Sequence, residues 1–412
     1  MIYNLHFDDG DVIEFDSIKF TINRDVEFKP RPYQHYFYEN KVEKSENKID
    51  IKCAKIQLGF VCNYKCKYCH YLPYHEPKIT QQDIEQTKKT IRVLFEKFNI
   101  SRSIEIWGGE PLVYWKQLKV LIEEIRRNSK DIPVAIISNG SLLTKEKAEF
   151  FVKHNVDYYM SHDGPGQSLR NEKDVLDDEK VIEALKTFWE KSDSNKFDNF
   201  RFHFTITPKA PNVIDTIRYL QNKTHEKVFI TTEGMVDKFV HNRDVATFSY
   251  EEQAILIESI LQAYNCDDEC FSSIHNRFDK MSENMASRKF ENRTGETFQK
   301  YMCNDTELDI LTITCNGDIS HCHAEKNNPS YKLGNICDDD FDLSAKLKYF
   351  TKMREHCKDC FYAFICVGGC PRLDDKNHKE YCENKILEGI VTLSAIMYRF
   401  FKKRLVRIEK KE

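Results

Sequence analysis

Two patterns of hydrophobic and polar positions alternate along residues 51–235. Short apolar runs such as "AKIQLGF" (54–60) and "PVAIISNG" (133–140) predict strands. Longer stretches with an apolar residue every three or four positions, such as "YWKQLKVLIEEIRRN" (114–128), predict helices. The whole segment contains six predicted strands, each separated from the next by a helix, which requires a parallel sheet with right-handed crossovers. Because a closed eight-unit barrel would need two more units, we expect an α/β fold with a partial, TIM-like (β/α)6 barrel.

The pattern changes on both sides of this predicted barrel. Residues 1–50 begin with "LHFDDGDVIEF", which predicts a hairpin with an Asp-Gly turn, and continue as an irregular connector. Residues 236–300 predict helices that bridge to residues 301–384, which are rich in cysteine and loops. Residues 385–412 predict one amphipathic helix with a basic end, which we expect to pack on its own domain rather than on a membrane.

Length and composition narrow the functional classes. A chain of 412 residues is too long for one ordinary core, and its net charge of −4 gives no reason to expect nucleic-acid binding. No apolar run reaches the ~18 residues that cross a bilayer, and no secretory signal is visible, so we expect a cytoplasmic protein without a membrane partner. In that reducing compartment, 15 cysteines favour metal or redox chemistry over disulfides.

Three of these cysteines lie close together after the first predicted barrel strand. The stretch "LGFVCNYKCKYCHY" (58–71) contains Cys62, Cys66 and Cys69, on the rim where loops of such barrels carry the chemistry. Three thiolates can hold three irons of a 4Fe-4S cubane and leave the fourth iron open to a substrate or cofactor. Zinc with His70 or a distant residue as fourth ligand is the alternative, but zinc sites mostly pair cysteines two apart and repeat the pair later.

Three further segments stand at the ends of the next predicted strands: "WGGEP" (107–111), "ISNGSLL" (137–143) and "SHDGP" (161–165). Each alone is typical of a turn. Together with the C-x3-C-x-aromatic-C loop, in which Tyr68 takes the aromatic place, they resemble the signature of the radical S-adenosylmethionine (SAM) superfamily.

The resemblance implies a set of SAM contacts. It places the Gly-Gly-Glu segment at the amino group of the SAM methionine and the Ser-Asn pair at its ribose or carboxylate. It also identifies the S-x-D-G-P segment and assigns the SAM carboxylate to an arginine that follows it. The implied residues are Tyr68, Gly108, Gly109, Glu110, Pro111, Ser138, Asn139, Ser161, Asp163 and Arg170.

The same resemblance implies the chemistry. The amino and carboxylate groups of SAM chelate the open iron, and a reduced cluster cleaves SAM to a 5′-deoxyadenosyl radical. This radical removes a hydrogen atom from an unactivated C–H bond, while the protein orients the partners and shields the radical. An electron donor such as flavodoxin or ferredoxin is the implied reductant.

The cysteines near the end of the chain have an order of their own. The runs "CNGDISHC" (315–322), "CKDCFYAFICVGGC" (357–370) and "YCEN" (381–384) resemble the SPASM domain, which binds two auxiliary 4Fe-4S clusters; a zinc ribbon is the alternative. Three clusters are therefore expected in all. The resemblance assigns Cys357, Cys360, Cys366 and Cys382 to the outer auxiliary cluster and Cys303, Cys322 and Cys370 to the inner one, with Cys315 as a substitute fourth ligand or an open iron in its place.

Enzymes with this two-part layout suggest two reactions. The first forms a crosslink in a ribosomally made peptide, and the second oxidises a cysteine or serine of a sulfatase to formylglycine. His323 stands where the second group has an aspartate base, which counts against that reaction and makes His323 a candidate catalytic residue. We therefore expect a peptide or small protein substrate and a crosslink. Because the first fifty residues lack a helical leader-binding module, a separate protein could recognise the leader. A non-catalytic iron–sulfur carrier or sensor is the alternative of another class.

Overall fold

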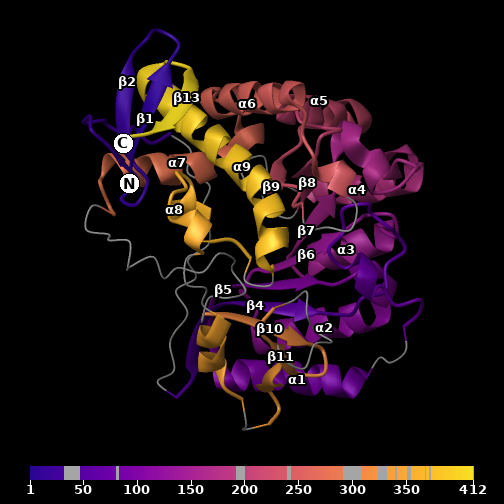
Figure 1. Cartoon of the computed structure of the whole chain (residues 1–412). Helices are drawn as coiled ribbons and strands as arrows, with labels where there is room; N and C mark the ends of the chain where they lie inside the picture. Colours follow the sequence, from indigo (N-terminus) through magenta and orange to yellow (C-terminus); the bar gives the residue numbers. More distant parts are fainter. Residues whose placement is uncertain are drawn as a thin grey trace.

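The computed structural model describes residues 1–31, 47–79, 83–191, 200–238, 243–290, 309–322, 332–338, 341–349, 354–366, 368–370 and 373–411. Its largest element is a nine-stranded sheet with the order β12-β11-β10-β4-β5-β6-β7-β8-β9. A separate four-stranded sheet lies beside the chain termini (Figure 1). Within the described ranges, no helix combines the length and the apolarity that a membrane crossing requires.

Six consecutive strands, from β4 to the β9 edge of the large sheet, are parallel and pair in chain order, as the sequence predicts. They are β4 (Ile49–Gln57), β5 (Phe98–Trp107), β6 (Val134–Ser138), β7 (Val156–Ser161), β8 (Phe200–Ile206) and β9 (Ile230–Met235). The helices between them are α1 (Ile84–Lys97), α2 (Trp115–Asn128), α3 (Lys145–Lys153), α4 (Glu179–Lys191) and α5 (Val213–Thr224). Because all six strands run the same way, their carboxyl ends meet at one edge.

Three strands that the sequence did not predict extend this sheet beyond β4. They are β10 (Ile310–Thr314), β11 (Asp318–Ser320) and β12 (Lys332–Asn335). Strand β10 pairs in parallel with β4, with Ile310 opposite Cys53, whereas β11 and β12 continue antiparallel. The first part of the expected cysteine-rich segment thus completes the barrel sheet. Among the described strands no pairing joins β9 to β12, so the sheet stays open.

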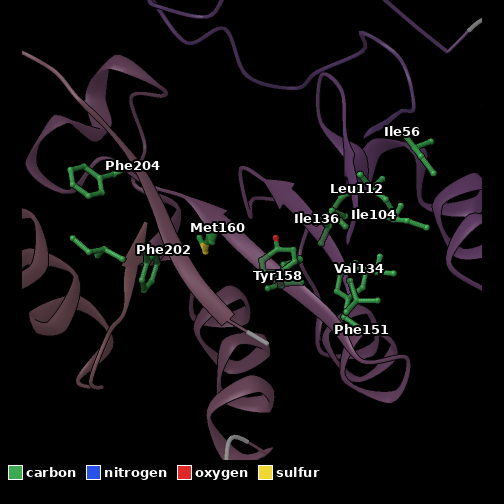
Figure 2. Packing of buried hydrophobic residues seen from close by; sticks show 14 of the residues in the cluster. Ile56, Ile104, Leu112, Val134, Ile136, Phe151, Tyr158, Met160, Phe202 and Phe204 are labelled. Atoms are coloured by element: carbon green, nitrogen blue, oxygen red, sulfur yellow. The ribbon is translucent and has the colours of Figure 1, made fainter. Parts of the chain in front are cut away.

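The core lies between this sheet and its helices. Alternate residues of the strands point toward the helices, and Figure 2 shows Ile56, Ile104, Ile136 and Phe202 among the buried side chains on this side. Stacked aromatic rings fill the space under α3 and α4, with Tyr158 parallel to Phe188 at 5.4 Å between ring centroids. Local capping fixes where helices begin. The Asp83 side chain, for example, accepts a hydrogen bond from the Gln86 backbone N–H at the start of α1.

The two ends of the chain form one unit. Strands β1 (Ile2–Phe7) and β2 (Val12–Asp16) form the predicted hairpin, and β3 (Thr21–Ile22) follows. The last strand, β13 (Leu405–Lys410), pairs with β1 on its other side (Figure 1). The prediction of one helix over residues 385–412 is therefore wrong. Helix α9 runs over Asp375–Phe401 and stops at Lys402, which takes a left-handed conformation with φ 58°.

This end unit packs on the helices of the bridging segment, α6 (Tyr250–Asn265) and α7 (Ser272–Ala286), and on α9. Its core joins Leu5, Ile13 and Phe15 of the hairpin to Met285 of α7 and Met397 of α9. The first residues are thus held by the last helix rather than forming an independent domain.

Candidate active site

A cavity of about 260 Å³ opens at the carboxyl ends of the parallel strands. A volume of this size is near the lower end of the range for small-ligand pockets. The loop after β4 and every parallel strand from β5 to β9 contribute to its wall. The lining residues are Cys62, Tyr64, Cys66, Tyr68, Cys69, His70, Tyr71, His75, Trp107, Gly108, Gly109, Glu110, Ile137, Ser138, Asn139, Ser161, Arg170, His203, Thr205, Met235, Val236 and Asp237.

The three cysteines of the loop after β4 face this cavity together. Burial raises the pKa of Cys62 to about 12 and that of Cys66 to about 11, so both thiols keep their protons at neutral pH unless a cation shares the cavity. A backbone hydrogen bond of 2.8 Å from the Lys67 N–H to the Leu169 carbonyl ties the loop to the segment after β7. Three convergent thiols without a fourth in the same wall suit a cubane cluster with one open iron.

The glycine pair after β5 is required by the packing of this loop. A Cβ atom on Gly108 would lie 2.6 Å from the Gly59 carbonyl oxygen, and one on Gly109 would lie 2.3 Å from that of Val61. Backbone hydrogen bonds cross the same contact, from the Gly109 N–H to Gly59 (2.7 Å) and from the Glu110 N–H to Val61 (2.9 Å). The end of β5 therefore packs directly against the segment after β4 that leads into the cysteine loop.

Glu110 is buried at the base of the cavity, with 1% of its surface exposed. Its Oε1 accepts hydrogen bonds from the Leu112 N–H (2.8 Å) and the Ser138 hydroxyl (2.8 Å), and its Oε2 accepts one from the Asn139 N–H (2.7 Å). Burial raises the pKa of Glu110, although these three donors oppose the shift. The carboxylate thus joins the ends of β5 and β6 and keeps acceptor capacity at Oε2 for a ligand in the cavity.

Arg170 is held in the cavity wall by a buried acid. The Asp163 carboxylate lies 3.0 Å from Arg170 Nε, accepts a hydrogen bond from the Tyr68 hydroxyl and accepts another from the Thr205 N–H (3.0 Å). Burial disfavours the charge on Arg170, but the pKa of Arg170 is raised because Asp163 outweighs that cost. Asp163 and Pro111 are buried without lining the cavity, so the structure places both behind the wall that the other implied SAM contacts form.

Residues 56–197 match the sequence model of the Radical SAM superfamily. This segment is a radical SAM domain. The match spans the cysteine loop, the glycine pair, Glu110 and Arg170, so most of the residues that line the cavity lie in the matched segment, whereas those from His203 onward lie beyond it.

The chain is similar in sequence to named relatives. The chain is 28% identical over 192 residues to the radical SAM cyclopropyl synthase TigE of Paramaledivibacter caminithermalis, which covers 43% of this chain and 40% of that protein. It is 24% identical over 348 residues to the serine-type anaerobic sulfatase-maturating enzyme of Bacteroides thetaiotaomicron, which covers 76% of this chain and 81% of that protein. The chain thus matches less than half the length of the first relative and most of the second.

A solved structure shares the fold. The structure described as native anSMEcpe with bound AdoMet and Cp18Cys peptide superposes with a TM-score of 0.55 at 18% identity, covering 82% of this chain and 99% of that chain. The radical SAM domain and the elements that follow it therefore have the α/β arrangement of that structure.

The outer cysteine set of the C-terminal segment comes together next to the radical SAM domain. Cys382 lies in α9 and Cys366 ends the short helix α8 (Ala363–Cys366). Burial, together with the neighbouring thiols of Cys357 and Cys360, raises the pKa of Cys382 to about 11, which places these groups within electrostatic range of one another. Cys366 interacts with the same three thiols. The sequence order of these four cysteines thus corresponds to proximity in space.

Only part of the inner cysteine set lies within the described residues. Cys303 and the candidate base His323 lie outside the described residues. Cys315 and Cys322 lie at opposite ends of the hairpin formed by β10 and β11, because Thr312 pairs with Ser320. About five residues of strand, or ~16 Å, separate the two positions, which is too far for adjacent ligands of one cubane. With this register, Cys315 is too far from Cys322 to be the fourth ligand of the same inner cluster.

Two histidines that the sequence reasoning missed accompany the outer set. His378 Nε2 lies 2.6 Å from the Gly368 carbonyl oxygen, which can only accept, so this nitrogen carries the proton. His378 Nδ1 then faces His356 Nε2 at 2.7 Å and Cys382 Sγ at 3.4 Å. His356 stands next to Cys357 in the sequence, and this adjacency was the available signal.

A charged group on α9 that the sequence reasoning also missed lies beside the cavity residue Asp237. Asp237, directly after β9, lies 3.6 Å from Lys385 Nζ and 3.9 Å from His70 Nε2. Lys385 also pairs with Glu388 at 3.0 Å, and Glu388 pairs with Arg277 of α7. Lys385 and Glu388 are three residues apart on one helix face, but nothing local shows that this face meets the end of β9.

Proposed function

We propose that this chain cleaves SAM reductively and uses the resulting 5′-deoxyadenosyl radical to abstract a hydrogen atom from a side chain of a peptide or small protein. The observation that carries the proposal is the shared cavity, in which Cys62, Cys66 and Cys69 face Glu110 and Arg170. A 4Fe-4S cluster held by the three cysteines supplies the electron and the open iron when bound.

The residues of the chain bind and orient SAM in this proposal. Arg170 is a permanent cation fixed by Asp163 and suits the SAM carboxylate. Glu110 Oε2 is the acceptor available for the SAM amino group, beside Ser138 and Asn139. The narrow cavity excludes water from a reactive radical. A non-catalytic iron–sulfur carrier would have no use for this arrangement.

The substrate class is proposed as a peptide, and the reaction as a crosslink in a ribosomally made peptide. A relative is named a cyclopropyl synthase, and a structure of the same fold is described with a bound peptide. Formylglycine formation is the second candidate, because the relative matched over most of its length is a serine-type sulfatase-maturating enzyme. Both reactions remove two hydrogens from the substrate.

Auxiliary clusters complete the proposal. Cys357, Cys360, Cys366 and Cys382 would hold one, and Cys303, Cys322 and Cys370 would hold the other. An auxiliary cluster supplies an acceptor for the electron that the substrate radical must lose. A flavodoxin or ferredoxin would reduce the SAM-binding cluster, and a separate protein would recognise a leader peptide.

The first experiment incubates reconstituted, oxygen-free protein with SAM, dithionite and a serine- or cysteine-containing peptide. We expect 5′-deoxyadenosine and a peptide that has lost two hydrogens. A hydrazide reagent separates the two reactions, since it labels a formylglycine aldehyde and leaves a crosslink unchanged. Full clusters with unconsumed SAM would instead support the carrier.

Matched cysteine variants test the cluster assignment. Cys62→Ala is expected to abolish 5′-deoxyadenosine formation while the auxiliary clusters stay. Cys53→Ala is the control, because Cys53 is fully buried in β4 and does not line the cavity. Iron content and electron paramagnetic resonance of both variants give the readout, and SAM cleavage by Cys62→Ala at the level of the control would refute the assignment.

A further inference from the structure

Two carboxylates line the cavity among the residues that the structure describes, and the protein engages them to different degrees. Glu110 accepts three short hydrogen bonds from the protein. Asp237 has charged neighbours at 3.6 Å and 3.9 Å, distances beyond an ordinary hydrogen bond, and its side chain is 24% exposed. Asp237 therefore keeps more acceptor capacity for a molecule in the cavity than Glu110, which keeps it at Oε2.

We propose that Asp237 accepts the proton that the substrate loses after its hydrogen atom has been abstracted. This inference rests on the proposed function and assigns it a catalytic base. It assigns that role to a residue that follows the sixth parallel strand, distinct from His323 in the C-terminal segment.

The surrounding charges allow Asp237 to change its protonation state. When Asp237 is ionised, Lys385 lies between two carboxylates, Asp237 and Glu388. When Asp237 takes up a proton, Lys385 keeps Glu388 at 3.0 Å, so no buried cation is left without a partner. The cost of neutralising Asp237 is thereby reduced.

The direction of the pKa shift of Asp237 supports its role as a base. Burial raises the pKa of Asp237, and the neighbouring Glu388 raises it further, whereas Lys385 and His70 lower it. The pKa of Glu388 is lowered to about 2 despite its burial, because Lys385 and Arg277 flank it. Glu388 thus stays ionised while Asp237 moves toward the range in which a carboxylate works as a base.

The step balances for either proposed reaction. The substrate C–H bond breaks and its hydrogen forms a C–H bond in 5′-deoxyadenosine. An S–H or O–H bond of the substrate then gives its proton to the Asp237 carboxylate and its electron pair to the new bond. The remaining electron goes to an oxidised iron–sulfur cluster, the class of oxidant that the C-terminal cysteines would hold.

The test separates hydrogen abstraction from proton removal. It uses the full-length, reconstituted protein with a peptide deuterated at the target carbon. We expect Asp237→Asn to cleave SAM and to transfer deuterium into 5′-deoxyadenosine, while product formation falls by about 10²-fold, the usual contribution of a general base. Asp244→Asn is the control, because Asp244 is exposed in the segment after β9 and does not line the cavity.

A second pair of variants distinguishes loss of the base from a folding defect. Asp237→Ala with added formate is expected to regain product, since a small carboxylate can occupy the vacated space, and Asp237→Glu should retain part of the rate. Peptide affinity, measured by titration in the absence of SAM, should be unchanged in all variants. Product formation by Asp237→Asn at the rate of the Asp244→Asn control would overturn the inference. Absence of 5′-deoxyadenosine in the unmodified protein would instead overturn the proposed function.

Discussion

Glu110 has a structural role, and we propose a SAM-binding role for the same side chain. Its carboxylate caps the turn after β5 through the Leu112 N–H and holds the end of β6 through Ser138 and Asn139. The residue therefore fixes the relative position of two strand ends that form the floor of the cavity. A substitution there should affect both stability and SAM affinity.

Glu110→Ala is expected to lower the free energy of unfolding by about 2–3 kcal/mol, because three buried donors lose their acceptor. The affinity for SAM should fall about tenfold, the equivalent of one hydrogen bond to a charged group. Thermal unfolding and isothermal titration calorimetry measure the two effects. Glu149→Ala, at an exposed position of α3, is the control and should change neither. Unchanged SAM affinity in Glu110→Ala would remove this residue from the SAM site.

At the scale of elements, the contact between the chain ends is the feature that local patterns did not reveal. Strand β13 adds to β1 at a separation of about 400 residues, from Tyr3 opposite Lys410 to Phe7 opposite Leu405. The inner face of β1 buries Leu5 against α9, while β13 leaves Val406 64% exposed. The stability of the end unit should therefore depend on the inner face of β1 rather than on the outer side chains of β13.

Leu5→Ala is expected to cost about 2–5 kcal/mol of unfolding free energy, because Leu5 is fully buried and its truncation leaves a cavity. Val406→Ala should change stability by less than about 0.5 kcal/mol. Chemical denaturation followed by circular dichroism compares the two variants. Equal effects would show that the end unit does not pack through this face of β1.

At the scale of the whole molecule, α9 connects three parts. It packs on the end unit through Met397, carries Cys382 of the outer cysteine set and contacts the cavity residue Asp237 through Lys385. Asn384 donates hydrogen bonds to the carbonyl oxygens of Val236 (2.7 Å) and Ala246 (2.8 Å), which fixes the helix against the end of β9. The charges around Glu388 should therefore contribute to the attachment of α9 to the radical SAM domain.

Glu388→Gln is expected to lower the free energy of unfolding at neutral pH by roughly 2–4 kcal/mol, because Arg277 and Lys385 lose a partly buried counterion. The pKa of Glu388 is about 2 in the folded protein against an ordinary value of 4.5. The stabilisation is therefore present above about pH 4.5 and is lost as the pH falls toward 2.

Denaturant titrations from pH 3 to pH 7 check this prediction. The difference between the unmodified protein and Glu388→Gln should shrink as the pH falls. Glu383→Gln is the control on the same helix, because the pair of Glu383 with Lys238 is exposed on the glutamate side and should contribute less than about 1 kcal/mol. A pH-independent difference would contradict the assigned ionisation of Glu388.

Local patterns were sufficient for much of the site. The strand–helix alternation predicted the six parallel strands, and the cysteine spacing together with the strand-end segments predicted residues that line one cavity. The reason is physical: parallel strands place their carboxyl ends at one edge, so residues after successive strands must meet there. The hairpin of residues 2–16 was predicted from its Asp-Gly turn, because that dipeptide favours the backbone conformation of a tight hairpin turn.

The sequence by itself predicted the cysteine loop and the strand-end residues that line the cavity, because coordination and turn formation depend on residue type and short spacing. Only the tertiary structure decided that β10 lies beside β4, that β13 joins β1 and that Lys385 faces Asp237. These contacts connect positions more than a hundred residues apart. Their partners depend on which surfaces remain to be buried once the local elements have formed, and no local periodicity records that outcome.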